Sequence, residues 1–233
     1  VDGVISVAVD VTERRRAERA LHQQEHAERE FRRRLTALHR VRNALSGIDD
    51  LNELWREAVR LGSAELGFDR VGIWMTTDRP EVLAGTFGID EGGNLRDERG
   101  EAVSARPGSV VGRPLAEPGR AHLRRDTSLF NEHGRQVGRG WQASAALWNG
   151  EHILGVLSVD NLLSRQPATD ADLELLTLYA STLGHLAFQL RTQQALRASE
   201  ERYRGLVESQ QDLIVRVAID GRFTFVNDAC CRK

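Results

Sequence analysis

The residue types that most often carry out chemistry in proteins are histidine and cysteine, and in this chain they are spread out. Seven histidines occur between positions 22 and 185, and no cysteine lies near any of them in the sequence. A bound zinc ion needs three or four His, Cys or acidic ligands, usually at short and regular spacings. We therefore expect no metal site.

The same residues bear on two other kinds of site. A haem group needs an axial ligand such as histidine, and His122, His133 and His152 are candidates, but nothing in their spacing selects one of them. We expect no haem. The two cysteines, Cys230 and Cys231, are adjacent, which excludes a disulfide framework and favours the reducing cytoplasm as the location.

No motif of a common enzyme class is found in the sequence. It has no Walker-type phosphate loop, no nucleophile elbow and no paired Glu/His constellation. We therefore predict that this segment is not an enzyme. Asp160 and Asn161 follow a strand-like run and could face a ligand, although such residues also commonly close a turn where a strand ends.

The composition excludes several classes of partner. Lys and Arg number 32 against 34 acidic residues, so the charge gives no argument for nucleic acid or for an acidic lipid surface. No apolar run approaches the roughly 18 residues that cross a bilayer, and no signal peptide is evident. We expect no nucleic-acid partner and no direct membrane contact. Since the sequence starts at Val1 and stops after NDACCRK, we also expect it to be a segment of a longer protein.

The elements that must position any site are two long helices on either side of a mixed region. In residues 3–11 β-branched residues alternate with others, which predicts a strand. A helix is predicted to follow over residues 13–47, and its apolar residues form a loose heptad that includes Leu35, Leu38 and Leu45. The arginine runs at 14–16 and 32–34 are interpreted as a solvated helix face. An amphipathic helix is predicted over residues 49–67, followed by strands at 71–77 and 80–89.

In the second half of the chain, turn residues and helix-capping residues mark the boundaries of the predicted elements more clearly. Asn149-Gly150 separates two strand-like runs, which predicts a hairpin with a type I′ turn. Thr169-x-x-Asp172 predicts a helix start, and the helix that follows repeats Leu183 and Leu190 at heptad spacing. A last pair of short strands is predicted around residues 220–221. This order of elements predicts an α+β fold, with an antiparallel sheet and helices packed on one side.

Residues 35–191 resemble a known family. The segments LTALHRVRNALSGIDDLNELWREAVRLGSAELGFDRVGIWM, GTFGIDEGGNLRDERG, ILGVLSVDN and TDADLELLTLYASTLGHLAFQL resemble, in this order, GAF domains of bacterial sensor proteins. DVTERRRAERAL at residues 10–21 resembles the end of a PAS domain, and SEERYRGLVESQQDLIVRVAIDGRFTFVND at residues 199–228 resembles the start of another.

These resemblances imply a domain layout. Residues 1–12 would end a PAS domain, 13–38 would be a signalling helix, 39–191 the GAF domain, 192–208 a helical linker and 209–233 the start of a second PAS domain. This series is similar to the sensory half of bacterial histidine kinases, hence of two-component systems, and less often of diguanylate cyclases. The resemblance implies a sensory module, with a ligand-free connector that only dimerises its neighbours as the alternative.

The resemblance also suggests three specific kinds of site: a phosphoacceptor histidine, a covalent bilin and a cyclic-nucleotide site. His39 in HRVRNAL is similar to a histidine kinase phosphoacceptor box, but it falls on the first GAF helix and no ATP-binding domain follows, so we interpret it as structural. Covalent bilin is excluded because no cysteine lies in residues 39–191. The Asn-Lys-Phe-Asp-Glu signature of cyclic-nucleotide-binding GAF domains is not completed around Asn161 and Asp170.

If a small molecule binds, fold analogy places it between the sheet and covering loops at residues 90–119 and 124–140. The candidate contacts are Trp74, Phe87, Trp141, Trp148, Asp160 and Asn161. For signalling we expect a parallel homodimer through the long helices, with a coiled-coil seam that includes Leu35, Leu38, Leu45, Leu183 and Leu190.

Overall fold

The structure is a computed structural model that describes residues 12–131, 133–209 and 215–226. The helices are α1 (Thr12–Leu45), α2 (Leu51–Ala64), α3 (Arg113–Ala116) and α4 (Asp170–Ser209). The strands are β1 (Arg70–Thr76), β2 (Val82–Ile89), β3 (Leu95–Asp97), β4 (Ala102–Ser104), β5 (His122–Phe130), β6 (Gln136–Trp148), β7 (Ile153–Asp160), β8 (Val215–Val217) and β9 (Phe223–Val226). No described helix has the length and apolar character needed to cross a membrane.

The chain divides into two compact units, residues 1–185 and 186–233. The first contains a seven-stranded antiparallel sheet of order β3-β2-β1-β7-β6-β5, with β4 also paired to β2. This confirms the predicted mixed fold with an antiparallel sheet. In the second unit β8 and β9 pair antiparallel, as Asp220-Gly221 predicted. The predicted PAS segments fall partly on residues 1–11, 210–214 and 227–233, which lie outside the described part.

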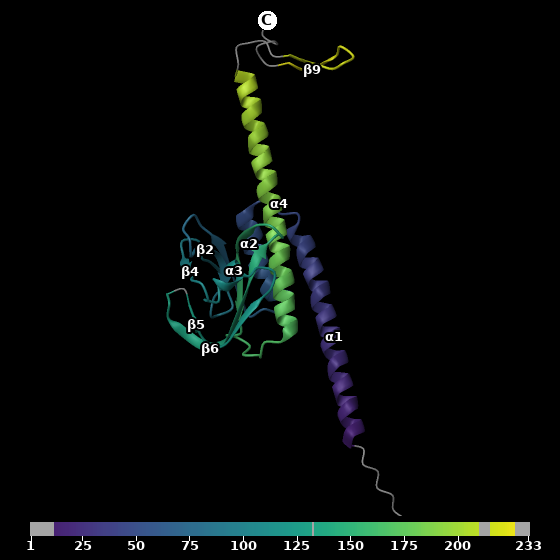
Figure 1. The fold of residues 1–233 in the computed structure, drawn as a ribbon, viewed down its shortest axis with the longest axis vertical. Coiled ribbons are helices and arrows are strands. Elements are labelled where there is room, and N and C mark those ends of the chain that lie inside the picture. The colour runs from purple at the N-terminus through teal and green to yellow at the C-terminus, as the bar shows by residue number, and fades with distance from the viewer. Residues whose placement is uncertain (1–11, 132, 210–214, 227–233) are drawn as a thin grey trace, which may run out of the picture. The chain divides into compact units, whose positions relative to one another are not determined.

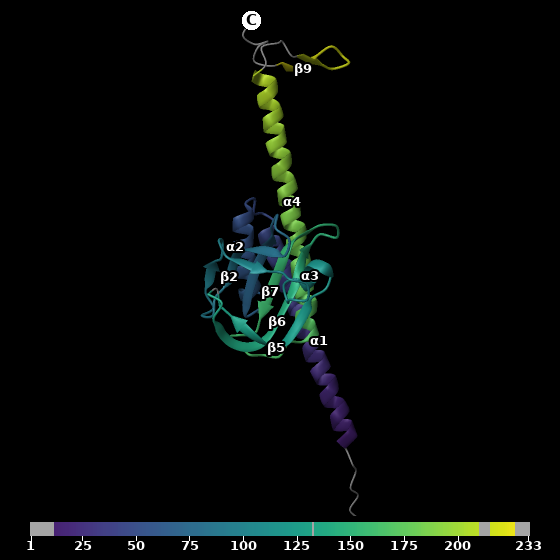
Figure 2. The same ribbon diagram turned by 60° about the vertical axis from the view of Figure 1, so that its left-hand side comes forward.

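The last part of α1, helix α2 and the first part of α4 form a helical layer on one face of the sheet (Figures 1 and 2). Helix α2 begins where Asp50 accepts a hydrogen bond from the Glu53 amide at 2.9 Å, and it buries Leu54, Trp55, Ala58 and Val59. Helix α4 begins with the predicted reciprocal cap: Thr169 N donates to Asp172 Oδ2 at 2.8 Å and Asp172 N to Thr169 Oγ1 at 3.2 Å.

The core lies between this helical layer and the sheet. Tyr179 of α4 is fully buried and donates its hydroxyl to the Ala58 carbonyl of α2 at 2.6 Å. Burial raises the pKa of Tyr179, so it stays a neutral donor. Gly184 lets α4 approach β6 closely, because a Cβ there would lie 2.5 Å from the Trp148 backbone nitrogen. The helix and the sheet are thus in direct backbone contact.

The other face of the sheet is covered by α3 and neighbouring loops, so the prediction that all helices pack on one side holds only for the long ones. Leu83, Ala105 and Val156 form a buried cluster there, with Trp74 and Leu115 packed against it. Trp74 and Val71 are both in β1, but their side chains point to opposite faces of the sheet. The Val71 side chain points toward Gly62 of α2. One strand therefore carries side chains into both layers.

Two predictions about the connections need correction. The β6–β7 hairpin is confirmed, but Trp148 pairs with Ile153, so four residues form the turn. Gly150 has φ 99° whereas Asn149 is not in the positive-φ region; instead the Asn149 side chain accepts from the amides of residues 151 and 152. The expected covering loop at 124–140 is mostly strand, since β5 and β6 occupy it.

Candidate ligand-binding cavity

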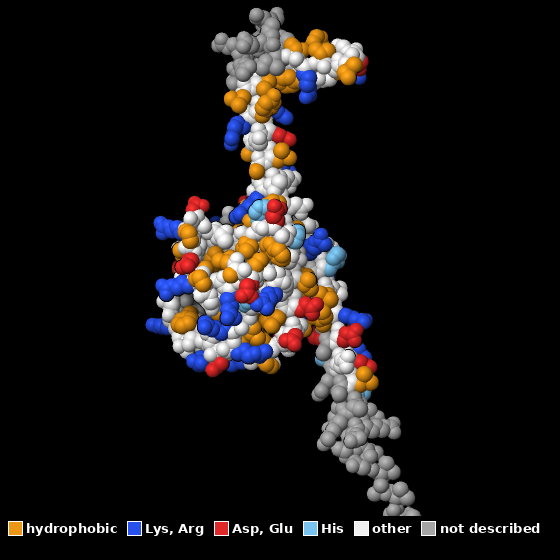
Figure 3. Space-filling model, viewed as in Figure 1, with side chains coloured by type: hydrophobic (Ala, Val, Ile, Leu, Met, Phe, Trp, Pro, Cys, Tyr) orange, Lys and Arg blue, Asp and Glu red, His pale blue; other side chains and the backbone are white. Residues whose placement is uncertain are grey.

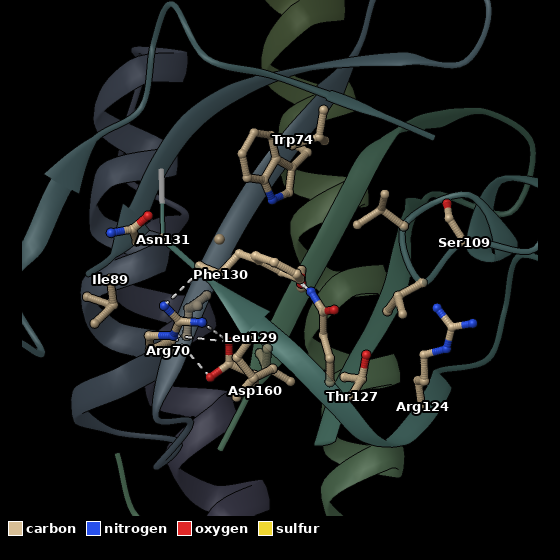
Figure 4. Close-up of a pocket in the computed structure, with 18 of the residues that line it drawn as sticks. Arg70, Trp74, Ile89, Ser109, Arg124, Thr127, Leu129, Phe130, Asn131 and Asp160 are labelled. Atoms are coloured by element: carbon tan, nitrogen blue, oxygen red, sulfur yellow. Dashed lines mark hydrogen bonds and ion pairs between the residues drawn. The ribbon is translucent and has the colours of Figure 1, made fainter. Parts of the chain in front are cut away.

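A cavity of about 480 Å³ lies on the face of the sheet opposite the long helices, a volume typical of small-molecule sites. Strands β1, β5, β6 and β7 contribute to its lining together with the loop that carries Ser109, as the close-up shows (Figure 4). Its lining includes five charged side chains: Arg70, Arg96, Glu98, Arg124 and Asp160. Five charged side chains in one concave site raise the question of which of them neutralise one another and which could bind a ligand.

The first pair of charges is Arg70 with Asp160, which stand directly opposite each other in the β1–β7 register. Arg70 Nε donates to both Asp160 oxygens at 3.0 Å and Nη2 donates to Oδ2 at 2.5 Å. Only 11% and 8% of the two side chains are exposed. Asp160 also accepts from the Leu162 amide at 3.0 Å, so it closes the turn after β7 as well as lining the cavity.

The second pair is Arg96 with Glu98 on the edge segment beside β2. Arg96 Nη2 donates to Glu98 Oε1, and Glu98 is buried. Gly88 of β2 makes room for this carboxylate, because a Cβ at Gly88 would lie 2.5 Å from Glu98 Oε1. The glycine therefore has a packing role at this wall of the cavity.

The remaining polar groups leave donors directed at the cavity. The indole nitrogen of Trp74 points into it in Figure 4, and among the described residues it has no hydrogen-bond acceptor. Gln142 Nε2 donates to Ser158 Oγ at 3.2 Å on the floor formed by β6 and β7. Arg124 is exposed at the mouth and, within the described part of the chain, makes no ion pair. An acceptor-rich ligand would satisfy the free donors.

Of the six predicted ligand contacts, Trp74 and Asp160 line this cavity. Phe87 is buried with the Arg99 guanidinium 5.3 Å from its ring centre, outside the lining. Trp141 donates its indole N–H to the Gln166 carbonyl at 2.8 Å. Trp148 lines a separate hollow of about 160 Å³ beside α4. The structure therefore does not gather the four aromatic residues into one site.

The Asn161 side chain makes hydrogen bonds within the fold and is not directed at a ligand site. Its Oδ1 accepts from the Trp141 amide at 2.8 Å and its Nδ2 donates to the Gln166 carbonyl at 2.9 Å. It therefore holds the turn after β7 against β6. The interpretation that strand-end residues close a turn applies fully to Asn161 and partly to Asp160.

The histidines considered for haem or phosphorylation do not meet at the cavity. His122 is buried and its Nε2 lies 3.0 Å from the Glu117 carbonyl, whereas His133 and His152 are exposed in turns. His39 is exposed on α1, with Nε2 3.3 Å from Asn43 Nδ2. His22 stands one turn from His26 on α1, a spacing that would suit two metal ligands. However, no group of three or more potential ligands occurs among the described residues.

The predicted seam positions are mostly in the core of the single chain. Leu45 and Leu183 are 1% and 0% exposed, and Leu38 and Leu190 are also buried, while Leu35 is half-buried. A side chain that its own chain buries is not available to a second chain. Charged residues at Leu183 would therefore disrupt the fold rather than test dimerisation.

Sequence reasoning missed the arginines and Glu98, the most distinctive residues of the site. Arg70 begins a strand and Glu98 follows one, and both positions are ordinary for solvated charges. Only the strand register brings Arg70 opposite Asp160, 90 residues away in sequence. The one available signal was Gly88, since glycine inside a strand often marks a close approach by another group.

Comparison with known proteins identifies the fold. The sequence model of the GAF domain family matches residues 50–185. A GAF domain structure from a phosphoenolpyruvate-protein phosphotransferase of Coxiella burnetii is similar, with TM-score 0.58 and 11% identity over 71% of this chain and 98% of that one. A methyl-accepting chemotaxis protein fragment gives TM-score 0.52 and 16% identity over 66% and 99% of the two chains. No curated protein matches the sequence.

A third similar structure is an enzyme. Free methionine-R-sulfoxide reductase from Neisseria meningitidis, in complex with its substrate, has TM-score 0.51 and 16% identity over 67% of this chain and 89% of that one. At these identities the structural matches establish the shared fold alone.

Proposed function

This chain belongs to the GAF domain family, and on that premise we propose that it is a sensory module that binds a small molecule in the cavity beside Trp74. GAF domains are sensory and regulatory modules of signalling proteins, and chemotaxis and phosphotransferase proteins are among the structural relatives. The observation that carries the proposal is the 480 Å³ cavity, whose polar groups converge from several strands.

The cavity is coupled to the helices through single strands. Arg70, Gly72 and Trp74 of β1 line the cavity, while Ile73, which alternates with them, is outside the lining and is buried in the layer beneath the helices. Packed cores shift between discrete arrangements rather than deform continuously. A ligand that moves β1 or β7 would therefore change the packing of α2 and α4.

The output we propose is a change in a homodimer joined by its helices. In the unit from residue 186 onwards, α4 exposes Leu196, Tyr203 and Leu206 at 59%, 71% and 60%, spaced by seven and three residues. This spacing is that of a coiled-coil seam. The parent protein would be a cytoplasmic sensor histidine kinase with PAS domains on both sides, or alternatively a diguanylate cyclase; this segment itself would not be catalytic.

A ligand-free connector is the second candidate, and one observation favours it. Of the five charged side chains described in the cavity lining, four already neutralise one another as Arg70–Asp160 and Arg96–Glu98 pairs. A cavity closed by its own ion pairs has less need of a ligand. In that case the domain would only space and dimerise its neighbours.

Native mass spectrometry with an absorbance spectrum distinguishes the two candidates. We expect a dimer that carries extra mass from a retained ligand. Thr127 lines the cavity, so Thr127→Trp should fill it and remove the extra mass, while the matched exposed change Thr192→Trp on α4 should keep it. A bare wild-type dimer after expression in several hosts and growth media would support the connector instead.

A further inference from the structure

Among the described residues that line the cavity, the positive charges outnumber the negative ones. Three arginines and two carboxylates are described there, and Arg124 is the one that belongs to neither the Arg70–Asp160 pair nor the Arg96–Glu98 pair. Basic side chains also gather over β5 and β6 on the face shown in Figure 3. An arginine at the mouth of a concave site attracts anions and binds planar carboxylate or phosphate groups through two N–H donors.

Arg124 also lines a second, smaller hollow of about 90 Å³. Its other side-chain walls include Arg113 and the buried His122, with the backbone of Gly108 closing it. Within the described residues Arg113 makes no ion pair, because the nearby carboxylate of Glu117 contacts Arg120. The interaction with Arg120 is also the main reason why the pKa of Glu117 is lowered. The charge of Arg113 adds a smaller contribution to this lowering. Among the described residues, the hollow is thus lined by two arginines, Arg113 and Arg124, that make no ion pair.

We infer that the ligand of this domain is a small organic anion whose carboxylate or phosphate group binds Arg124, where the 480 Å³ cavity meets the 90 Å³ hollow. The body of the ligand lies in the larger cavity, where the Trp74 indole N–H offers a further donor. In Figure 4 the Arg124 side chain rises beside the loop that carries Ser109, on the other side of the cavity from the Arg70–Asp160 pair. The small hollow, at about 90 Å³, has room for such a group. This inference rests on the proposed ligand-binding function.

Titration calorimetry with simple probes tests the inference. We expect benzoate or phenyl phosphate to bind the wild-type chain, and benzamide, which is isosteric with benzoate but neutral, to bind at least about tenfold more weakly. Arg124→Gln should remove this preference. Arg125→Gln is the matched control, because Arg125 is the neighbouring residue on β5, is exposed and does not line either hollow.

Inorganic phosphate separates the two sources of negative charge. If the site selects phosphates, inorganic phosphate should compete with phenyl phosphate and benzoate should bind weakly; a carboxylate site would show the reverse. If benzamide bound as tightly as the better of benzoate and phenyl phosphate, the inference would be overturned while leaving a ligand-binding domain. No binding of any anion at about 10 mM, or an unchanged preference in Arg124→Gln, would also overturn it. The retained mass in native spectrometry tests the proposed function independently.

Discussion

The carboxylate of Asp172 joins the first and last helices of the domain. It accepts a hydrogen bond from Arg34 Nη1 at 2.5 Å and also caps α4 through Thr169. About a fifth of each ion-paired side chain is exposed, 21% for Arg34 and 19% for Asp172. Burial acts to raise the pKa of Asp172, but the hydrogen bonds from Arg34 and Thr169 outweigh it, so this pKa lies below its ordinary value.

We predict that Asp172→Asn lowers the free energy of unfolding by about 1–3 kcal/mol at pH 7. Because the folded pKa is depressed, the contribution of the carboxylate is complete above the unfolded value of about 3.9 and is lost as pH falls through the folded pKa. The difference between wild type and variant should thus shrink from pH 7 to pH 3 in urea titrations.

The neighbouring acid provides the control for that experiment. Asp170 lies in the same first turn of α4 but is exposed and makes no ion pair among the described residues. Asp170→Asn should change stability by at most about 0.5 kcal/mol. If both variants behaved alike at every pH, the Arg34 contact would have no role in stability. The cap at Asp172 was evident in the sequence, whereas its partner Arg34, 138 residues away, was not.

At the scale of elements, the contact between α4 and β6 depends on a glycine. A Cβ at Gly184 would lie 2.5 Å from Trp148 N and 2.8 Å from the Leu147 carbonyl carbon, and backbone atoms cannot rotate away as side chains do. We predict that Gly184→Ala destabilises the domain by about 1–3 kcal/mol, although alanine is the better helix former by about 1 kcal/mol. Thermal and urea unfolding would measure the change.

Gly47, in the turn after α1, is the matched control. A Cβ at this position would meet nothing within 4 Å, and its φ is not in the positive region. Gly47→Ala should therefore be neutral or slightly stabilising. An equally stable Gly184→Ala would mean that α4 can move away from β6 at little cost, which would also weaken the proposed coupling between cavity and helix.

At the scale of the whole molecule, the proposed dimer depends on side chains that the single chain leaves exposed. Leu196 of α4 is 59% exposed, unlike Leu183 in the core. We predict that Leu196→Glu raises the dimer dissociation constant at least about tenfold, because it places a charge in an apolar seam. Analytical ultracentrifugation over a range of concentrations would measure it.

Ala198→Glu provides the control for charge. Ala198 is exposed and lies about 200° around the helix from Leu196, away from the proposed seam. The dimer should persist in this variant. If both variants remained dimers with unchanged affinity, α4 would not be the dimer contact, and the relay along this helix would have to be abandoned.

The sequence by itself determined what depends on local pattern. The amphipathic helix α2, the cap of α4 and the β6–β7 hairpin follow from periodicity, capping residues and turn residues, each within a few positions of one another. The apolar repeat in α4 was evident as well, but periodicity cannot tell a core helix from a dimer seam. The structure buries Leu183 in the core and leaves Leu196 exposed, so only Leu196 is available for the proposed seam.

The cavity, by contrast, was decided only by tertiary structure. The Arg70–Asp160 pair depends on strand register, and the place of Glu98 depends on the space left by Gly88. That Arg124 makes no ion pair with another described residue depends on which carboxylates are already paired. Charged residues at strand ends look alike in a sequence, because most of them are solvated. Their roles are set by distances between segments that are far apart along the chain, and only the folded backbone fixes those distances.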